Sequence, residues 1–145
     1  MTEKPKDDEL IAMIDIKEVV TTKLTRDLRE GLGVCVEFNN ELFDEKGNKI
    51  GTSVGIGVLS ANGEKNENGE DRFQLFSATD HLEDGTILWT GACPHDPTQI
   101  TKEHSVQAVG TSGRYLGKTG TRHFQVYDRP DGQTTILKSS FFLRG

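Results

Sequence analysis

Cysteines and long apolar runs are scarce or missing in this sequence. The two cysteines, Cys35 and Cys93, lie far apart and lack the C-x-x-C or His/Cys spacing of a zinc site. They suggest neither a metal site nor a disulfide framework, and we expect both thiols to be reduced, in a cytoplasm. No apolar run reaches the roughly 18 residues of a membrane span, and residues 1–15 lack the apolar core of an export signal. The sequence therefore predicts neither a membrane span nor export.

Positive charge is also in short supply. Lysine and arginine together number 17, against 23 aspartates and glutamates, which leaves a formal net charge of −6. Nucleic acids and anionic membranes attract proteins through a basic face, so we expect neither as the main partner. A chain of 145 residues is long enough for a single domain with its own hydrophobic core. The plainest interpretation is an acidic soluble domain.

Segments rich in β-branched and aromatic residues recur along the chain, separated by turn residues. This spacing is typical of an all-β sandwich or barrel. We predict strands at residues 16–25, 34–43, 49–60, 72–82, 86–94, 101–109, 119–128 and 133–143. The connectors at residues 44–48, 83–85 and 130–132 carry residues typical of hairpin turns, so neighbouring strands should run antiparallel.

A sheet of this kind can close on itself, and the interior is then filled by side chains or holds one small ligand. Only 33% of the residues are apolar, so many inward positions must carry small or polar groups, which favours a ligand cavity. We predict an all-β, eight-stranded antiparallel up-and-down β-barrel over residues 16–145. Residues 49–60 alternate most clearly, with Ile50, Val54 and Ile56 on one face and small residues on the other. Residues 62–71 are polar and predict a solvated loop.

Residues 1–15 precede this barrel, and residues 6–15 combine acidic side chains with the apolar residues Leu10, Ile11, Met13 and Ile14. The pattern predicts either a short amphipathic helix or a tail. A helix this short is marginal unless it docks on the rest of the protein. The sequence leaves the two alternatives open.

The stretch GTSGRYLGKTG, residues 110–120, resembles a phosphate-binding loop at first sight. Such a loop needs two glycines separated by four residues and must open a helix, whose N-terminal N–H groups hold the anion. Here Gly113 and Gly117 are separated by only three residues, and the chain continues into a predicted strand. Nucleotide binding is therefore not predicted. The glycines, which include Gly110 and Gly120, instead indicate a tight connection that needs positive φ or close backbone approach.

The same stretch carries a resemblance to a known family. SGRYLGKTG, together with FNNELFDEKGNKIGTSVG at residues 38–55 and LEDGTI at residues 82–87, is similar to the small β-barrel spirotetronate/spirotetramate cyclases. These cyclases are intramolecular Diels–Alderases and belong to the wider allene oxide cyclase-like barrels. The likeness runs from about residue 17 to residue 127.

The resemblance implies a cofactor-free [4+2] cyclase that folds a linear polyketide inside the barrel. A diene would meet the exocyclic methylene of a tetronate or tetramate ring, and a spiro-cyclohexene would form. A pericyclic step needs no nucleophile and gains mainly from a dry, preformed cavity that orders the substrate. The absence of a Ser/His/Asp, zinc or carboxylate-pair signature agrees with such a reaction.

The resemblance also implies a set of substrate contacts on the inner face near the mouth of the barrel. They are Phe38, Phe76, His95, Val106, Phe124 and Val126. Strand alternation supports part of this set, because Phe124 and Val126 share one face. The chain departs from the family at several of these positions. In place of Phe76, related cyclases can carry a tyrosine, and the hydroxyl of that tyrosine contacts the dicarbonyl head of the substrate. They can also carry a tryptophan in place of Phe124 and aromatic residues in place of His95 and Val106.

Because Phe76 cannot donate a hydrogen bond, another side chain could polarise the substrate carbonyl. Gln74, His95 and Arg122 are the candidate donors. Each has an alternative interpretation. His95 lies in CPHDP and fits a capped loop residue, Arg122 could pair with an acidic side chain inside the barrel, and Gln74 would face solvent if its neighbours Phe73 and Leu75 pointed inward.

Family members close the mouth with a segment between the first two strands. Here that segment is RDLREGLG, from Arg26 to Gly33, in which Leu28 and Leu32 would give the lid an apolar side and the glycines at its end would act as hinges. An ordinary surface loop is the alternative. Some relatives use an N-terminal helix instead, so residues 8–14 are a second candidate lid.

Three classes of function are compatible with the sequence. The resemblance favours a [4+2] cyclase that acts on a linear tetronate or tetramate polyketide without cofactor or metal. An allene oxide cyclase-like cyclase of another substrate would share the barrel. A lipocalin-like carrier would bind apolar small molecules and return them unchanged. A homodimer is expected only by analogy with the family.

Overall fold

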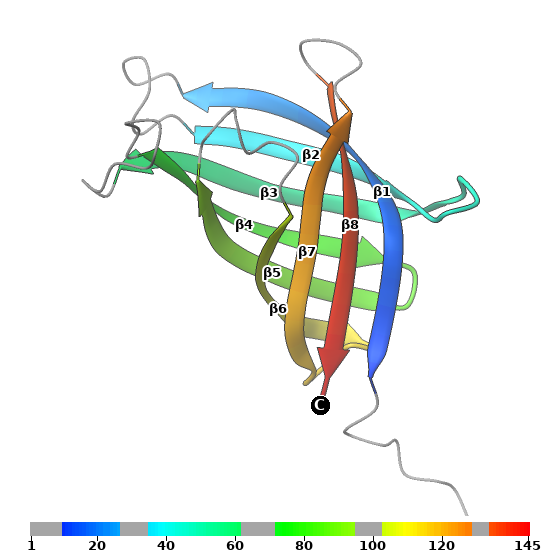
Figure 1. Cartoon of the computed structure of the whole chain (residues 1–145). Coiled ribbons are helices and arrows are strands. Elements are labelled where there is room, and N and C mark those ends of the chain that lie inside the picture. The colour runs from blue at the N-terminus through cyan, green and yellow to red at the C-terminus, as the bar shows by residue number, and fades with distance from the viewer. Residues whose placement is uncertain (1–9, 27–34, 62–71, 95–102, 129–133) are drawn as a thin grey trace, which may run out of the picture.

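The chain forms a closed barrel of eight antiparallel strands, each paired with its neighbours in chain order, and β1 closes on β8 (Figure 1). This computed structural model describes residues 10–26, 35–61, 72–94, 103–128 and 134–145. The strands are β1 (Ile11–Arg26), β2 (Cys35–Phe43), β3 (Lys49–Ala61), β4 (Arg72–Leu82), β5 (Gly85–Pro94), β6 (His104–Gly113), β7 (Thr119–Asp128) and β8 (Thr134–Arg144). The predicted fold class is confirmed. The predicted loop at 62–71 and turn at 130–132 lie outside the described residues.

Strand β3 shows how small and large residues are divided between the inner and outer faces of the barrel. Its small residues face the interior, where Ser53 is fully buried, while Val54 and Ile56 are 43% and 53% exposed on the outside. A Cβ atom on Gly55 would lie 2.3 Å from the backbone oxygen of Ser77 in β4. Glycine is therefore required where these two strands approach closely.

The first strand starts earlier than predicted. Residues 11–13 pair with β8, so the alternatives of a helix or tail are wrong for residues 11–15. Ile11 and Ile16 are buried on the inner face, and pairing with β8 satisfies backbone groups that a short isolated helix would leave exposed. A bulge lies between Met13 and Ile16, where Asp15 has a φ of 57°. This extra residue breaks the period-2 alternation and made the apolar pattern look helical.

The sixth strand is displaced towards the glycine-rich stretch, because residues 110–113 continue β6 and pair with the start of β5. Only residues 114–118 form the turn to β7. The predicted tight connection is thus confirmed but is shorter than expected. A Cβ on Gly110 would lie 1.6 Å from the backbone oxygen of Tyr115, so the turn folds back directly over this glycine.

The barrel has two ends, which we name by the strands. The base is the end where β1 begins and β8 ends, and the mouth end is where β1 ends and β2 begins (Figure 1). Buried apolar side chains fill the interior towards the base, where the Tyr115 ring packs edge-on against Phe141 with 5.9 Å between ring centroids. These side chains are Ile11, Ile16, Leu42, Ile87, Tyr115, Phe141 and Leu143.

Candidate functional site

Four aromatic rings from four strands meet on the inner face of the barrel. They are Phe38 of β2, Phe76 of β4, Trp89 of β5 and Phe124 of β7. Phe76 contacts both Trp89 and Phe124 edge-on, with ring centroids 5.4 and 5.6 Å apart. Edge-on and offset contacts of this kind add to the free energy gained by burying the rings. We call these four rings the aromatic cluster.

The aromatic cluster is less completely buried than the interior near the base. Phe38 is 8% exposed and Trp89 4%, whereas Phe76 and Phe124 are only partly buried. Gln74 and Val126, which lie closer to the mouth end, are also partly exposed. The exposed part of the aromatic cluster is therefore formed by Phe76 and Phe124, on the side of Gln74 and Val126.

A layer of buried polar side chains lies beneath the aromatic cluster, on the side towards the base. Arg122 donates from Nε to Asp80 Oδ2 at 2.8 Å and from Nη2 to Glu18 Oε1 at 2.7 Å, and all three side chains are at most 2% exposed. We call this group the polar layer. Its members are Glu18, Asn40, Ser53, Asp80, Arg122 and Ser139.

Glu18 is the most heavily engaged member of the polar layer. The Ser139 hydroxyl donates to Glu18 Oε1 at 2.9 Å, and the Asn40 amide donates to Glu18 Oε2. Burial by itself would lower the pKa of Arg122, but the carboxylates of Asp80 and Glu18 raise that pKa above its ordinary value. The guanidinium therefore stays charged inside the barrel.

The polar layer holds one ring of the aromatic cluster in place. The Trp89 indole donates from Nε1 to Asp80 Oδ1 at 3.0 Å, and the guanidinium carbon of Arg122 lies 4.4 Å from the centroid of the Trp89 ring. The ring is thus fixed by a hydrogen bond on its edge and by a cation–π contact on its face. Trp89 is a rigid part of the inner wall.

The structure brings most of the predicted contact residues together. Phe38, Phe76, Val106 and Phe124 belong to the core cluster or pack against it. Val126 lies on the same face of β7 as Phe124, one step nearer the mouth end. What each residue does remains a prediction.

The three predicted donors have different surroundings. Gln74 shares the inner face of β4 with Phe76 and lies over Gly57, where an added Cβ would come within 2.6 Å of Gln74 Nε2. The alternative with Leu75 inward is not observed, because Leu75 is 44% exposed. Arg122 has the acidic partners that its alternative interpretation required. His95 lies outside the described residues.

The two predicted lids are located differently. Leu28, Leu32 and Gly33 lie outside the described residues, and Arg26 is the last residue of β1. Residues 11–14 of the N-terminal candidate belong to β1, which pairs with β8 at the base. They lie at the opposite end from the mouth, so this part of the second candidate lid is wrong. Backbone pairing with β8 decides its position.

Sequence reasoning missed Trp89, Glu18 and Asp80. A signal for the two acids was present, because each lies at an inward position of its strand between apolar neighbours two residues away. Trp89 is the single tryptophan of the chain and alternates with Ile87 and Gly91. Strand alternation identifies all three as inward residues, but it does not show that they contact one another.

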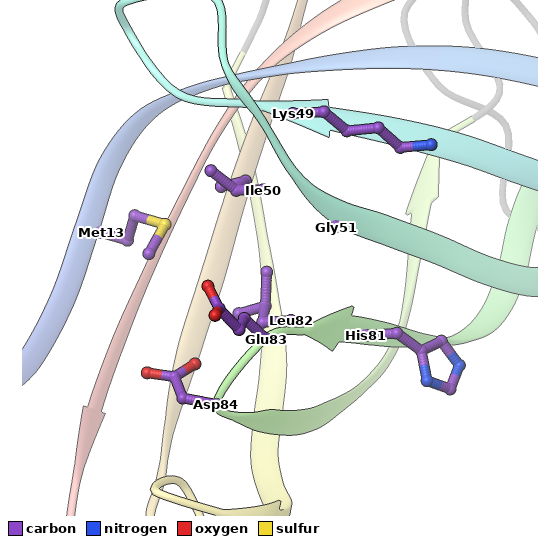
Figure 2. Close-up of a pocket in the computed structure, with 8 residues that line it drawn as sticks. All are labelled: Met13, Lys49, Ile50, Gly51, His81, Leu82, Glu83 and Asp84. Atoms are coloured by element: carbon purple, nitrogen blue, oxygen red, sulfur yellow. The ribbon is translucent and has the colours of Figure 1, made fainter.

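A pocket of about 670 Å³ lies at the base, whereas the aromatic cluster lies farther along the strands towards the mouth end (Figure 2). Figure 2 shows the carboxylates of Glu83 and Asp84 directed to the side of Met13, with Lys49 and His81 extending away. The Tyr115 hydroxyl donates to Asp84 Oδ1 at 2.7 Å. This bond is the main cause that lowers the pKa of Asp84, while burial and then Asp84 raise the pKa of Tyr115. Asp84 thus holds the Tyr115 side chain in place at the base. The pocket is lined by Met13, Lys49, Ile50, Gly51, His81, Leu82, Glu83 and Asp84.

Neither a metal cluster nor a spanning helix is found in the part of the chain that the structure describes. No group of three or more His, Cys, Asp or Glu side chains there could hold a metal ion. No helix in the same residues is long and apolar enough to cross a membrane.

Comparison with known proteins places this barrel among related folds. The model of the allene oxide cyclase barrel like domain matches residues 16–137. No curated protein sequence matches the chain. Among solved structures, the barrel is similar to the Diels–Alderase AbmU from Streptomyces koyangensis, with a TM-score of 0.75, 22% identity and coverage of 94% of this chain and 68% of that one.

Two further structures are similar to the same extent. AbnU, an exo-specific intermolecular Diels–Alderase, has a TM-score of 0.75 and 21% identity over 94% of this chain and 98% of its own. A nonspecific heme-binding cyclase that catalyses [4+2] cycloaddition during neoabyssomicin biosynthesis has a TM-score of 0.76 and 22% identity. The match covers 94% of this chain and 67% of that one. At these identities the likeness concerns the fold. The expected absence of a cofactor remains a prediction.

Proposed function

Because this chain belongs to the allene oxide cyclase barrel-like family, we propose that it is a [4+2] cyclase of polyketide biosynthesis. It would enclose a linear tetronate or tetramate polyketide and form the spiro-cyclohexene in one pericyclic step. Support comes from the solved barrels of similar fold that are Diels–Alderases and from the sequence motifs at residues 38–55 and 112–120. Its two widely separated cysteines favour a reducing compartment, so we place this enzyme in the cytoplasm.

The observation that carries the proposal is the aromatic cluster with its exposed side towards the mouth end. A cycloaddition breaks no bond to a proton and needs no nucleophile, so its rate depends on bringing diene and dienophile into contact in one orientation. Flat apolar rings held by packing, and in Trp89 by Asp80 and Arg122, offer such an orienting wall. Partial exposure of Phe76 and Phe124 allows a substrate to reach it.

Gln74 is the donor that we propose from the described residues. Its side chain lies on the inner face between the mouth end and Phe76, where this chain has no tyrosine hydroxyl. An amide N–H there could hydrogen-bond the carbonyl that activates the dienophile, an interaction worth about 2–4 kcal/mol at a dry site. His95 stays a second proposed donor, and residues 26–33 stay the proposed lid.

We also propose that two copies associate through the outer face of β3 and β4. Val54, Ile56 and Leu75 are exposed there. Their outward neighbours Asn39, Ser77, Thr79 and Thr90 are uncharged, while Glu37, which pairs with Ile56, is charged. Copies of a protein with a net charge of −6 repel each other least through a face with few charges. Ile56→Lys should convert a dimer to a monomer in sedimentation experiments, and an unchanged mass at equal concentration would contradict the proposal.

The test of activity uses purified protein, a linear tetronate or tetramate polyketide and no added metal or cofactor. We expect a product of unchanged mass and altered chromatographic retention, formed faster than in buffer. Phe124→Ala should reduce this rate at least about tenfold, because one side of the orienting wall is removed. Val54→Ala on the outer face is the matched control and should keep the rate. Tight binding without any conversion would favour the carrier instead.

A further inference from the structure

The polar layer carries more negative than positive charge. Glu18 and Asp80 contribute two carboxylates, and Arg122 contributes one guanidinium, so the formal charge of the three is −1. All three are buried, where a charge interacts more strongly with its neighbours than it would in water. An anionic group brought next to this layer would be repelled. A neutral group would not be.

The polar layer also has hydrogen-bonding capacity that the described residues do not use. Ser53 Oγ, Asn40 Oδ1 and Arg122 Nη1 are buried and have no hydrogen-bond partner among the described residues. Buried polar atoms are nearly always paired, because an unpaired one has lost its hydrogen bonds to water without replacing them. These three atoms therefore indicate that a further polar group completes the layer.

The three unpaired atoms belong to neighbouring residues. Ser53 pairs across the sheet with Asn40 on β2 and with Asp80 on β4, so these side chains form one inward row. Arg122 reaches this row from β7, because its Nε and Nη2 both donate to Asp80. The Asn40 orientation is set by Glu18, since only the amide nitrogen can donate to that carboxylate.

We infer that the polar layer binds a neutral carbonyl group of a conjugated ligand and keeps anionic groups out of the depth of the barrel. Ser53 and Arg122 supply the donors for the carbonyl oxygen. The excess carboxylate disfavours a carboxylate or enolate at the same place. The route to the layer passes Phe76 and Phe124, the two rings of the aromatic cluster that are only partly buried.

One consequence rests on the proposed function. A tetronate or tetramate ring is acidic and carries its negative charge at neutral pH. This ring would therefore lie at the mouth end, near Gln74, and the neutral polyketide chain deeper, with a chain carbonyl at Ser53. The polar layer would then determine which end of the substrate enters first.

The test uses two environment-sensitive naphthyl ketones of equal size, one neutral and one whose acyl chain ends in a carboxylate. Dissociation constants come from fluorescence titration of the whole protein. We expect the neutral ketone to bind at least about tenfold more tightly, as one unit charge within about 10 Å at an effective dielectric constant of about 20 would require. Equal affinities would overturn the inference.

Two charge variants separate the polar layer from the net charge of the protein. Glu18→Gln should reduce the preference for the neutral ketone about tenfold, and a rotated Asn40 amide can still pair with the new side chain. Glu41→Gln removes the same charge from an exposed residue that contacts Lys49, and should leave the preference unchanged. Equal effects of the two variants would assign the preference to net charge and refute the inference.

Ser53→Ala tests the hydrogen bond without disturbing the fold, because the Ser53 hydroxyl has no partner among the described residues. It should weaken the neutral ketone about three- to tenfold and leave a naphthalene of equal size without the carbonyl unaffected. A crystal structure with an ordered water on Ser53 and the ketone elsewhere would refute the inference. No polyketide is needed, so a chain that passes these tests without cyclising one would refute only the proposed function.

Discussion

The two ends of the barrel are built by the same eight strands but are filled differently. Towards the base, apolar side chains such as Phe141 and Leu143 are at most 1% exposed, and Tyr115, in the turn that ends at Lys118, is fully buried. Towards the mouth end, aromatic rings line the inner face and two of them stay partly exposed. The polar layer separates the two regions. From this contrast we expect the base to contribute more to the stability of the fold, and the aromatic side is the proposed ligand-binding side.

The largest effect on stability is expected when the ion pairs of the polar layer, which lies between the two regions, are removed. Arg122→Met leaves Glu18 and Asp80 buried without their counter-charge, which should lower the free energy of unfolding by about 3–5 kcal/mol. Urea denaturation measures this change. Arg114→Met is the matched control, because its ion pair with Asp84 is about half exposed. A loss as small as in the control would show that the polar layer does not stabilise the barrel.

A smaller effect, the difference in unfolding free energy between two phenylalanine variants, should distinguish the two regions directly. Phe141→Ala at the base removes a ring that is 1% exposed and should cost about 3–5 kcal/mol of unfolding free energy. Phe124→Ala removes a ring that is only partly buried and should cost less than half of that. Equal losses in urea denaturation would contradict the division between a stabilising base and a ligand-facing aromatic side.

The smallest effect concerns the pH dependence of the base. The pKa of Asp84 lies below the ordinary 3.8, so its contribution is present above that pH and is lost as the pH falls through the lower folded value. The pKa of Tyr115 lies above the ordinary 10.0, so its contribution is present below pH 10.0 and is lost as the pH rises beyond it. Tyr115→Phe should make the melting temperature less dependent on pH at both the acidic and the alkaline extreme. An unchanged pH profile in the variant would refute a role for this hydrogen bond.

Local signals predicted most of the barrel, and every strand except β1 and β6 agrees with its predicted range within one residue at each end. The two largest deviations have local causes. In β1, the bulge next to Asp15 shifted the alternation and made residues 6–15 look helical. In β6, the glycines of the connection continue the strand, because Gly113 still pairs with Gly85 before the chain turns. The glycines correctly predicted a connection between β6 and β7, but they did not predict the residue at which strand pairing ends.

The candidate site was predicted less completely. Strand alternation and the family resemblance led to Phe38, Phe76, Val106 and Phe124, which lie on the inner face. Alternation and resemblance could not predict that Asp80 and Arg122 contact the Trp89 ring. These contacts depend on which inward residues lie at the same height in the barrel. The register between strands decides this height, and a shift of two residues would preserve the alternation while changing every contact.

The number of strands, their antiparallel order and the inward or outward face of most residues can be derived from the sequence alone. These properties depend on alternation and turn residues, which are close together along the chain. The meeting of Arg122 with Asp80 and Glu18, which lie 42 and 104 positions away in the sequence, required the folded barrel. Closure of β1 on β8 brings these strands to one interior, where burial makes their charges interact strongly.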